Sequence, residues 1–319
     1  MPATDAADFD VLTCGEAMCL LIAQQVGPLE QAQQFDRATA GAELNVAIGL
    51  ARLGLRVGYL SRLGRDALGG SLLAALDREG VDRQHVRLSM HHPTGLMFKS
   101  RTGDGTDPRV EYFRRGSAAS HMDVSDCPAG LLMRTRHLHL TGILPALSAG
   151  TSALADHLAR EAKAAGCTIS FDPNLRPSLW PSQAVMVQRL NGLAARCDWI
   201  LPGLAEGQVL TGQQRPEAIA QFYLDRGAQA VAVKLGAAGA YYASADERGT
   251  VPGAPVARVV DTVGAGDGFA VGLISARLEG HGLSQAVARG NAIGARVVGF
   301  PGDSDGLPGR AQLALMMQA

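Results

Sequence analysis

The sequence has no surplus of charge of either sign. Its 319 residues include 29 Lys and Arg against 30 Asp and Glu, which gives a formal net charge of −1. Nucleic acid and anionic membranes attract proteins through an excess of positive charge. We therefore expect neither as a partner, and any preference for an anionic ligand must come from a few local groups.

Cysteine is scarce, and its spacing forms no CxxC pair. The five cysteines are odd in number and lie mostly in apolar, strand-like contexts such as GCTISFD and CDWIL. A disulfide framework or a cysteine-rich zinc site needs paired or regularly spaced cysteines. We expect reduced, buried thiols and a cytoplasmic location.

Long hydrophobic runs are also missing. No apolar run approaches the roughly 20 residues of a membrane span, and the first ten residues, MPATDAADFD, contain acids where a signal peptide needs positive charge. Membrane insertion and export are therefore not expected. Apolar residues still make up 47% of the chain and charged residues 18%, so the composition favours one folded domain spanning 1–319 with a large core.

Short apolar or β-branched runs alternate along the chain with longer segments of helical periodicity. The expected strands are FDVLTCG, RVGYLSRLG, RHLHLTG, CTISFDPN, CDWILP and AVAVKLG. The expected helices are ELNVAIGLARLG, GGSLLAALDREG, TSALADHLAREAKAAG, SQAVMVQRLNGLAARC and PEAIAQFYLDRG. This alternation predicts an α/β fold with a doubly wound, mainly parallel sheet flanked by helices on both faces.

Two segments, at about 17–43 and 91–120, break the alternation. Each contains short polar-apolar strands with loops and no crossover helix. We expect a few antiparallel strands that project from the main sheet as a small lid. Because an exposed strand edge needs cover, such a lid favours a homodimer or a larger homo-oligomer.

The stretch VVDTVGAGDGFAVGLISARLEG places Asp267 in a glycine-rich turn before an apolar segment. Helical periodicity over 270–278 and the capping Gly280 predict that GAGDG begins a helix. The backbone amides of 264–267 would then lack helical partners and point, like the helix dipole, toward a bound anion.

A carboxylate that only complements a helix dipole needs no such density of glycine. We therefore interpret Asp267 as a general base that takes the proton of an attacking hydroxyl while the adjacent amides hold the transferring group. A purely structural Asp267 is the alternative. The chain contains neither GxxxxGK[ST] nor a strand followed by GxGxxG, which argues against a P-loop protein and a Rossmann dehydrogenase.

Two further patterns point to other classes of protein. GDSDG, residues 302–306, has the G-x-S-x-G spacing of a hydrolase, but no histidine follows Ser304. His137 and His139 lie on one face of an expected strand, yet no third metal ligand stands at a recognised spacing. We favour hydrogen-bonded core histidines over a metal site.

The glycine-rich stretch DTVGAGDGFAVG resembles the C-terminal signature of the ribokinase/PfkB carbohydrate kinase family, and AGAELNVAIGLARLGLRVGYLSRLGRDALG resembles its N-terminal signature. Within this family, the blocks AGAELNVA, EYFRRGSAAS, LTGILPALS, FDPNLRPSLW and GDSDGLPG are most similar to kinases of 2-keto-3-deoxygluconate (KDG). The resemblance implies a ribokinase-like fold and ATP-dependent phosphorylation of the primary hydroxyl of KDG, with Mg²⁺ and, in some relatives, K⁺.

The resemblance also leaves other substrates open, namely 2-keto-3-deoxygalactonate, 5-dehydro-2-deoxygluconate and fructose. A sugar-acid binding protein without catalysis is a further alternative, which the intact Asp267 disfavours. An assay of ATP consumption with KDG separates such a binding protein from a kinase.

By the same resemblance, Asp267 is the base and the amides of Gly264, Ala265 and Gly266 stabilise the transferring phosphoryl group. The residues expected to bind the sugar acid are Gly41, Asn45, Tyr112, Arg114 and Arg176. Those expected to border ATP are Lys234, Gly236, Gly239 and Asn291.

Two acids are expected near metal ions. Glu206 would act on Mg²⁺ through water, although LPGLAEGQ has Gly203 where the family often has Asn. Asp261 matches an acid that helps hold a monovalent cation in some relatives, with an ordinary role in the turn as its alternative.

Two arginines are the basis for expecting a sugar acid as the substrate. A carboxylate is held best by the planar, two-pronged guanidinium group, so Arg114 and Arg176 would separate a sugar acid from a neutral sugar. For each, an ordinary surface ion pair is the alternative.

Overall fold

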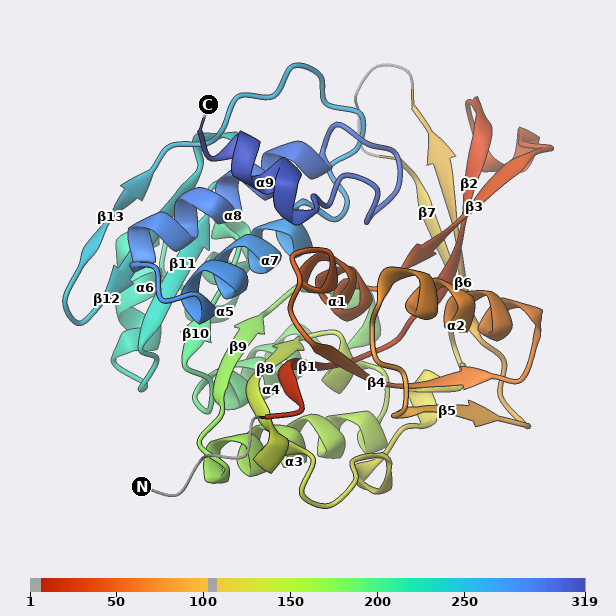
Figure 1. Ribbon diagram of the computed structural model, residues 1–319, viewed down its shortest axis with the longest axis horizontal. Helices are drawn as coiled ribbons and strands as arrows, with labels where there is room; N and C mark the ends of the chain where they lie inside the picture. The colour runs from red at the N-terminus through yellow and green to blue at the C-terminus, as the bar shows by residue number, and fades with distance from the viewer. Residues whose placement is uncertain (1–6, 103–107, 319) are drawn as a thin grey trace.

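The computed structural model describes residues 7–102 and 108–318. Within them, the main sheet has nine strands in the order β13-β12-β11-β10-β9-β8-β1-β4-β5 (Figure 1). The strands are β1 (Phe9–Cys14), β4 (Val57–Gly64), β5 (Val86–Ser89), β8 (Thr135–Thr141), β9 (Thr168–Asp172), β10 (Trp199–Ile200), β11 (Ala230–Lys234), β12 (Ala240–Ser244) and β13 (Arg248–Val251). All neighbours from β11 to β5 are parallel, and β12 and β13 add an antiparallel edge. The predicted fold class is confirmed.

Helices cover both faces of this sheet (Figure 1). On one face lie α1 (Ala42–Arg52), α2 (Ala67–Glu79), α7 (Ala265–Leu278), α8 (Leu283–Val297) and α9 (Arg310–Met316). On the other lie α3 (Ala149–Ala164), α4 (Gln183–Ala194), α5 (Leu204–Thr211) and α6 (Pro216–Leu224). Successive strand residues point to opposite faces of the sheet. Val11 therefore packs in the core beneath α1, α2, α7, α8 and α9, and Leu12 packs in the core beneath α3 to α6. Among the described residues, no helix has both the length and the apolar character needed to cross a membrane.

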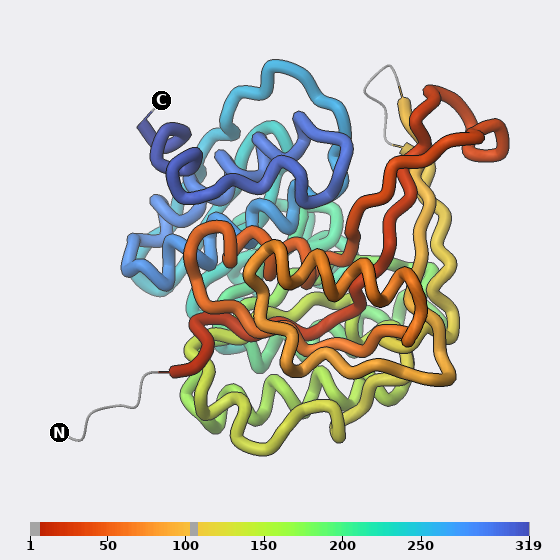
Figure 2. Tube along the Cα trace, turned by 45° about the vertical axis from the view of Figure 1, so that its right-hand side comes forward, coloured from red at the N-terminus to blue at the C-terminus, as the bar shows by residue number. Residues whose placement is uncertain are grey.

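A second sheet of four strands, the lid sheet, projects from the main body (Figure 2). It consists of β2 (Met18–Val26), β3 (Phe35–Ala40), β6 (Gly95–Arg101) and β7 (Val110–Phe113), in the order β3-β2-β6-β7. These strands lie inside the predicted segments 17–43 and 91–120. The outer pairs are antiparallel, as predicted.

The expectation of purely antiparallel pairing in the lid was wrong at its centre, where β2 and β6 are parallel. Strand β2 follows β1 directly and β6 follows β5 directly. Since β1 and β5 run in the same direction through the main sheet, the two strands that leave from them also run in the same direction. Each then returns through its own antiparallel partner.

The order of the strands creates a switch point beside β1. This strand pairs with β4 on one side and with β8 on the other, and the chain builds the sheet outward in both directions. In such sheets, ligands bind in the crevice at the carboxyl ends of the strands beside the switch point. The lid sheet and the start of α7 meet at this crevice, where residues of both line one cavity.

Candidate active site

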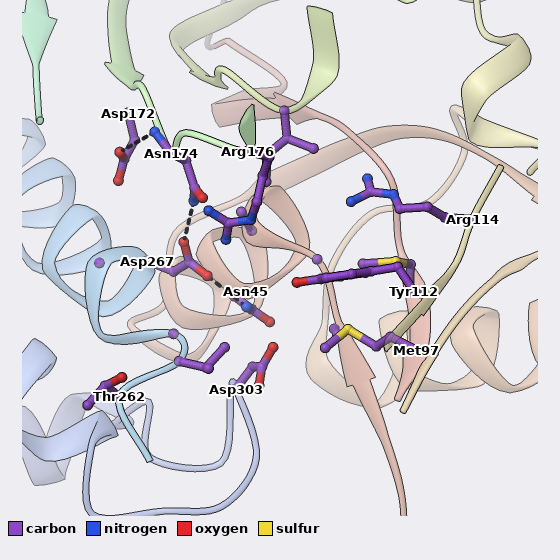
Figure 3. A pocket seen from close by; sticks show the side chains of 18 of the residues that line it. Asn45, Met97, Tyr112, Arg114, Asp172, Asn174, Arg176, Thr262, Asp267 and Asp303 are labelled. Atoms are coloured by element: carbon purple, nitrogen blue, oxygen red, sulfur yellow. Dashed lines mark hydrogen bonds between the residues drawn. The ribbon is translucent and has the colours of Figure 1, made fainter. Parts of the chain in front are cut away.

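A cavity of about 220 Å³ lies between the lid sheet and the carboxyl ends of the main strands (Figure 3). The predicted site residues that line it are Gly41, Asn45, Tyr112, Arg114, Arg176, Glu206, Lys234, Gly264, Gly266 and Asp267. They come from segments as far apart in the sequence as the start of α1 and the start of α7. The fold thus brings ten of the predicted residues to one place, and their roles stay predictions.

The glycine-rich turn forms the N-terminus of α7, as predicted. Gly264 precedes the helix with φ of 85°, a left-handed conformation that favours glycine. A Cβ at this position would also lie 2.5 Å from the backbone oxygen of Asp303. The amide of Ala265 donates to the backbone oxygen of Thr262 at 3.3 Å, whereas Gly264 and Gly266 line the cavity, where the N-terminus of the helix and its dipole favour an anion.

Asp267 lies in the first turn of α7 and is 8% exposed. Its carboxylate accepts hydrogen bonds from two amide side chains: Asn45 Nδ2 at 2.8 Å and Asn174 Nδ2 at 3.4 Å (Figure 3). Asn45 comes from α1 and Asn174 from the loop after β9. Two elements on different sides of the crevice thus orient one carboxylate.

The environment of Asp267 raises its pKa to about 8. Burial is the main cause, and the neighbouring carboxylates of Asp172 and Asp303 add to it. The hydrogen bond from Asn45 and the charge of Lys234 act in the opposite direction. A base is most effective when its pKa lies near the working pH, so this carboxyl group suits proton transfer from a hydroxyl.

Lys234 ends β11 beside the glycine-rich turn at the start of α7. Its Nζ lies 2.6 Å from Asp172 Oδ2, at the end of β9, and 3.3 Å from where a Cβ of Gly266 would be. Burial alone would lower the pKa of Lys234, but Asp172 and Glu206 outweigh it and the pKa is raised. The side chain is only 17% exposed, so it is a buried charge facing the anion site rather than a solvated surface charge.

Arg114 already has a carboxylate partner within the protein. Its guanidinium pairs with Glu16, and both side chains are buried. Glu16 also accepts a hydrogen bond from the hydroxyl of Ser117, and the Arg114 guanidinium carbon lies 5.7 Å from the ring centre of Tyr112. Arg114 is therefore fixed in orientation before any ligand binds. Neither the expected contact with the substrate carboxylate nor the alternative of a surface ion pair anticipated this buried pair.

Arg176 has a different environment on the loop after β9. It is partly buried and its side chain points into the cavity (Figure 3). Its Nη1 donates to the backbone oxygen of Leu175 at 2.9 Å. No carboxylate among the described residues forms an ion pair with Arg176, whereas Arg114 has one, so Arg176 retains more donors for an anionic ligand.

Glu206 lines the cavity but is held by the backbone. Its two oxygens accept from the amides of Leu175 and Gly203, each at 2.7 Å. In the described part of the chain, no three His, Cys or carboxylate groups are arranged to hold a metal ion. Mg²⁺ commonly binds through one or two carboxylates, waters and substrate phosphates, and the carboxylates of Glu206 and Asp172 both line the cavity.

Five predicted residues do not line the cavity. They are Ala265, Gly236, Gly239, Asn291 and Asp261. Asn291 Nδ2 donates to the backbone oxygens of Val251 and Pro252, and a Cβ on Gly239 would lie 2.1 Å from that same Val251 oxygen. Two of the residues assigned to ATP therefore lie together at the end of β13, and their nucleotide contacts stay predictions.

The structure also gives the surroundings of Asp261, of the histidines considered as metal ligands and of the serine considered as a hydrolase nucleophile. Asp261 pairs with the ammonium group of Lys99. His137 bonds through both ring nitrogens to Thr168 and Ser170, and His139 bonds to the same Ser170, so both are hydrogen-bonded core histidines as favoured. Ser304 lies in an irregular turn and not at a strand-to-helix elbow, which removes the hydrolase interpretation.

Four carboxyl or amide side chains in or beside the site were not found from the sequence. They are Glu16, Asp172, Asn174 and Asp303. Asp172 and Asn174 belong to the block FDPNLRPSLW and Asp303 to GDSDGLPG, so the signal was present in motifs already noted. Glu16 lies two residues after β1 within CGEAM, where a lone acid in an apolar stretch could have pointed to a buried ion pair.

The sequence and the fold were compared with those of known proteins. Residues 8–310 match the family described as "pfkB family carbohydrate kinase". The chain is 50% identical over 311 residues to a 2-dehydro-3-deoxygluconokinase of Bacillus subtilis (strain 168), covering 97% of this chain and 96% of that protein.

Two solved structures are similarly close in fold. The PfkB protein from Polaromonas sp. JS666 has a TM-score of 0.89 and 52% identity, covering 96% of this chain and 99% of that one. A putative ribokinase II from E. coli in complex with ATP and Mg²⁺ has a TM-score of 0.89 and 27% identity, covering 97% and 99%. The chain belongs to the pfkB family of carbohydrate kinases.

Proposed function

We propose that this kinase transfers the γ-phosphoryl group of ATP to the primary hydroxyl of 2-dehydro-3-deoxy-D-gluconate, the compound abbreviated KDG, and releases the 6-phosphate and ADP. The observation that carries the choice of an acidic sugar is Arg176, whose guanidinium points into the cavity without a carboxylate partner among the described residues. The name of the Bacillus subtilis relative supports the same substrate.

The chemistry follows from the positions around Asp267. Its carboxylate accepts the proton of the sugar hydroxyl, whose oxygen then bonds to the γ-phosphorus while the bond from phosphorus to the leaving ADP oxygen breaks. The amides of Gly264 and Gly266, which line the cavity, and the ammonium of Lys234 stabilise the charge on the transferring group. Mg²⁺ bound with the nucleotide would neutralise the phosphates, held through water by Glu206 and Asp172.

The direct test is an assay of ADP formation with a panel of sugars. We expect saturable turnover with KDG and slower turnover with fructose, at equal MgATP. The C4 epimer 2-keto-3-deoxygalactonate and 5-dehydro-2-deoxygluconate complete the panel. Absence of turnover with KDG, with turnover on another member, would reassign the substrate without changing the reaction type.

The pKa of Asp267 predicts a pH dependence of this activity. Only the deprotonated carboxylate accepts a proton, so kcat/KM for KDG should fall about tenfold per pH unit as the pH drops below the pKa of about 8. Above that pH, the profile should level off. We expect initial rates measured from about pH 6 to about pH 9 to show this single limb.

Asn45→Ala provides the control for that assignment. Asn45 lowers the pKa of Asp267 by its hydrogen bond, so its loss should shift the limb to higher pH, whatever it does to the maximal rate. A flat profile in the wild type, or an unshifted limb in the variant, would separate the pH dependence from Asp267.

We also expect the lid sheet to close over the bound sugar acid. Met97 and Tyr112 from the lid line the cavity together with Asp267, so a bound sugar acid would contact both bodies, and closure would exclude water as a competing acceptor. Hydrogen exchange should slow in β6 and β7 on addition of KDG, while α3, on the far face, stays unchanged. Unaltered exchange in β6 and β7 at saturating KDG would rule out a moving lid.

The cysteines support a cytoplasmic location, and the exposed lid sheet supports a homodimer. The five cysteines are free thiols, and burial raises the pKa of Cys14 and Cys197, which keeps them unreactive and suits a cytoplasmic enzyme. Phe113 and Val26 of the lid sheet are 59% and 65% exposed. A second copy of the chain would cover these side chains in a homodimer.

A further inference from the structure

Lys99 is the most deeply buried cationic side chain near the site, with 1% of its side chain exposed. It lies in β6 of the lid sheet but extends to two loops of the main body. Its Nζ contacts the carboxylate of Asp261, donates to Asp303 Oδ1 at 2.7 Å and donates to the backbone oxygen of Pro301 at 3.1 Å. An ammonium group has three donors, and all three are used.

The charges in this cluster are matched so that the ammonium stays protonated. Burial alone would lower the pKa of Lys99, but Asp303 and Asp261 outweigh it and the pKa is raised. Burial raises the pKa of Asp303, an effect that Lys99 opposes. Without Lys99, two buried carboxylates, each 5% exposed, would face one another with no counter-ion in this cluster.

Both acids lie in the segments that shape the glycine-rich turn at 264–267, which is the phosphate-binding turn of the proposed function. Asp261 Oδ1 accepts from the amide of Val263 at 3.0 Å, which fixes the chain just before Gly264. The backbone of Asp303 packs so closely on Gly264 that a Cβ there would lie 2.5 Å from its oxygen. Displacement of either acid would therefore move the first amides of the anion site.

The same side chain connects this turn to the lid. Lys99 pairs with Ile22 of β2 and with Val110 of β7, and Met97, two residues earlier on the same strand, lines the active-site cavity. One cation therefore joins the sugar-covering sheet to the phosphate-binding turn.

We propose that the Lys99 ammonium is a built-in cation that holds the phosphate-binding turn in its active geometry, so that phosphoryl transfer requires no dissociable monovalent cation. The inference rests on the kinase function proposed above. Two carboxylates and a carbonyl oxygen form a ligand set of hard oxygens that suits a small cation, and Lys99 supplies that charge from within the chain.

The neighbouring space makes this proposal testable by rescue. A cavity of about 340 Å³ lies next to the cluster and is lined in part by Lys99, Asp261 and Pro301. Shortening Lys99 to alanine would leave the oxygen ligands in place and open room for an ion from solution. Lys99→Met would remove the charge but keep the space filled.

The experiment compares wild type, Lys99→Ala and Lys99→Met in tetramethylammonium chloride and in KCl at equal ionic strength, with kcat, KM and Tm measured in each. Wild type should be equally active in both salts. Lys99→Ala should lose up to about 100-fold in kcat without K⁺, because small displacements of catalytic groups have effects of that size. K⁺ or NH₄⁺ should restore kcat and raise Tm in this variant in a saturable way, and should do neither in Lys99→Met.

Lys163→Ala is the control for loss of a lysine ion pair away from the site. Lys163 pairs with Asp198 on the far side of the sheet at 3.2 Å, with 56% of its side chain exposed, and its loss should cause no salt-specific change. Activation of the wild type by K⁺, or a lowered Tm with unchanged kcat in Lys99→Ala, would overturn the proposal. Failure of K⁺ to affect either kcat or Tm in Lys99→Ala would overturn it too. If the wild type does not phosphorylate KDG, the proposed function fails, while the Tm response of Lys99→Ala to K⁺ still decides whether Lys99 replaces a cation.

Discussion

Replacement of Asp267 by asparagine should lower kcat by roughly 10²–10⁴-fold or more while leaving the fold and ATP binding intact. The amide is nearly isosteric with the carboxylate but cannot accept the hydroxyl proton at neutral pH. Its oxygen can still accept the hydrogen bond from Asn45, which is the shorter of the two bonds to Asp267, at 2.8 Å against 3.4 Å from Asn174. The variant therefore isolates proton transfer from positioning.

The measurement is steady-state turnover of KDG with thermal melts and a titration of nucleotide binding. Asp198→Asn is the matched control: Asp198 is also a buried carboxylate, 3% exposed, that accepts hydrogen bonds from the backbone, but it lies outside the cavity. It should retain its kcat. A correctly folded Asp267→Asn enzyme with turnover near that of the wild type would exclude Asp267 from the chemistry.

Six strands of the main sheet, β1, β4, β8, β9, β10 and β11, were predictable because they carry a local signal. Apolar runs such as that of β1 are buried on both faces, as Val11 and Leu12 show by packing in different cores, and the helices between them have their own periodicity. Strand direction is not encoded in that way. The antiparallel β12 and β13 follow β11 through short turns at one edge of the sheet, whereas the parallel pairing of β2 with β6 in the lid joins strands that are distant in sequence.

In the candidate site, too, residues of one local motif could be predicted, whereas contacts between distant segments could not. Asp267 and the glycines before it could be found because one short turn combines the helix start, the free amides and the acid. The interactions that position this turn could not, since Lys99 and Asp303 lie 204 residues apart in sequence and meet only in the folded chain. The left-handed backbone of Asn174, with φ of 40°, likewise gave no sequence signal beyond the tolerance of asparagine for that conformation.

Arg114 lies where it was predicted to lie, but it also has a structural role that was not predicted. The sequence predicted a residue that meets the substrate carboxylate, and the side chain does line the cavity. It is also half of a buried ion pair with Glu16. Breaking such a pair leaves an unpaired buried charge and is strongly destabilising, so Arg114→Ala should lower Tm as well as activity, and the substrate test must rely on Arg176.

Replacement of Arg176 by alanine should lower kcat/KM for KDG by roughly 10- to 150-fold, because a charge-assisted hydrogen bond contributes about 1.5–3 kcal/mol. The loss on fructose should be far smaller, since fructose has no carboxylate. 2-Keto-3-deoxygalactonate, which carries the same carboxylate, should lose as much as KDG. Tm should stay close to that of the wild type because no carboxylate among the described residues depends on Arg176 for its charge.

Arg176→Lys distinguishes charge from geometry at this position. Lysine keeps the positive charge but lacks the planar pair of donors that matches a carboxylate, so it should recover only part of the activity on KDG. The comparison uses wild type, Arg176→Ala and Arg176→Lys on KDG and fructose at matched MgATP. Equal proportional losses on both sugars would mean that Arg176 serves the phosphates or the loop after β9, and the preference for an acidic sugar would then have to reside in Arg114, which is already neutralised by Glu16.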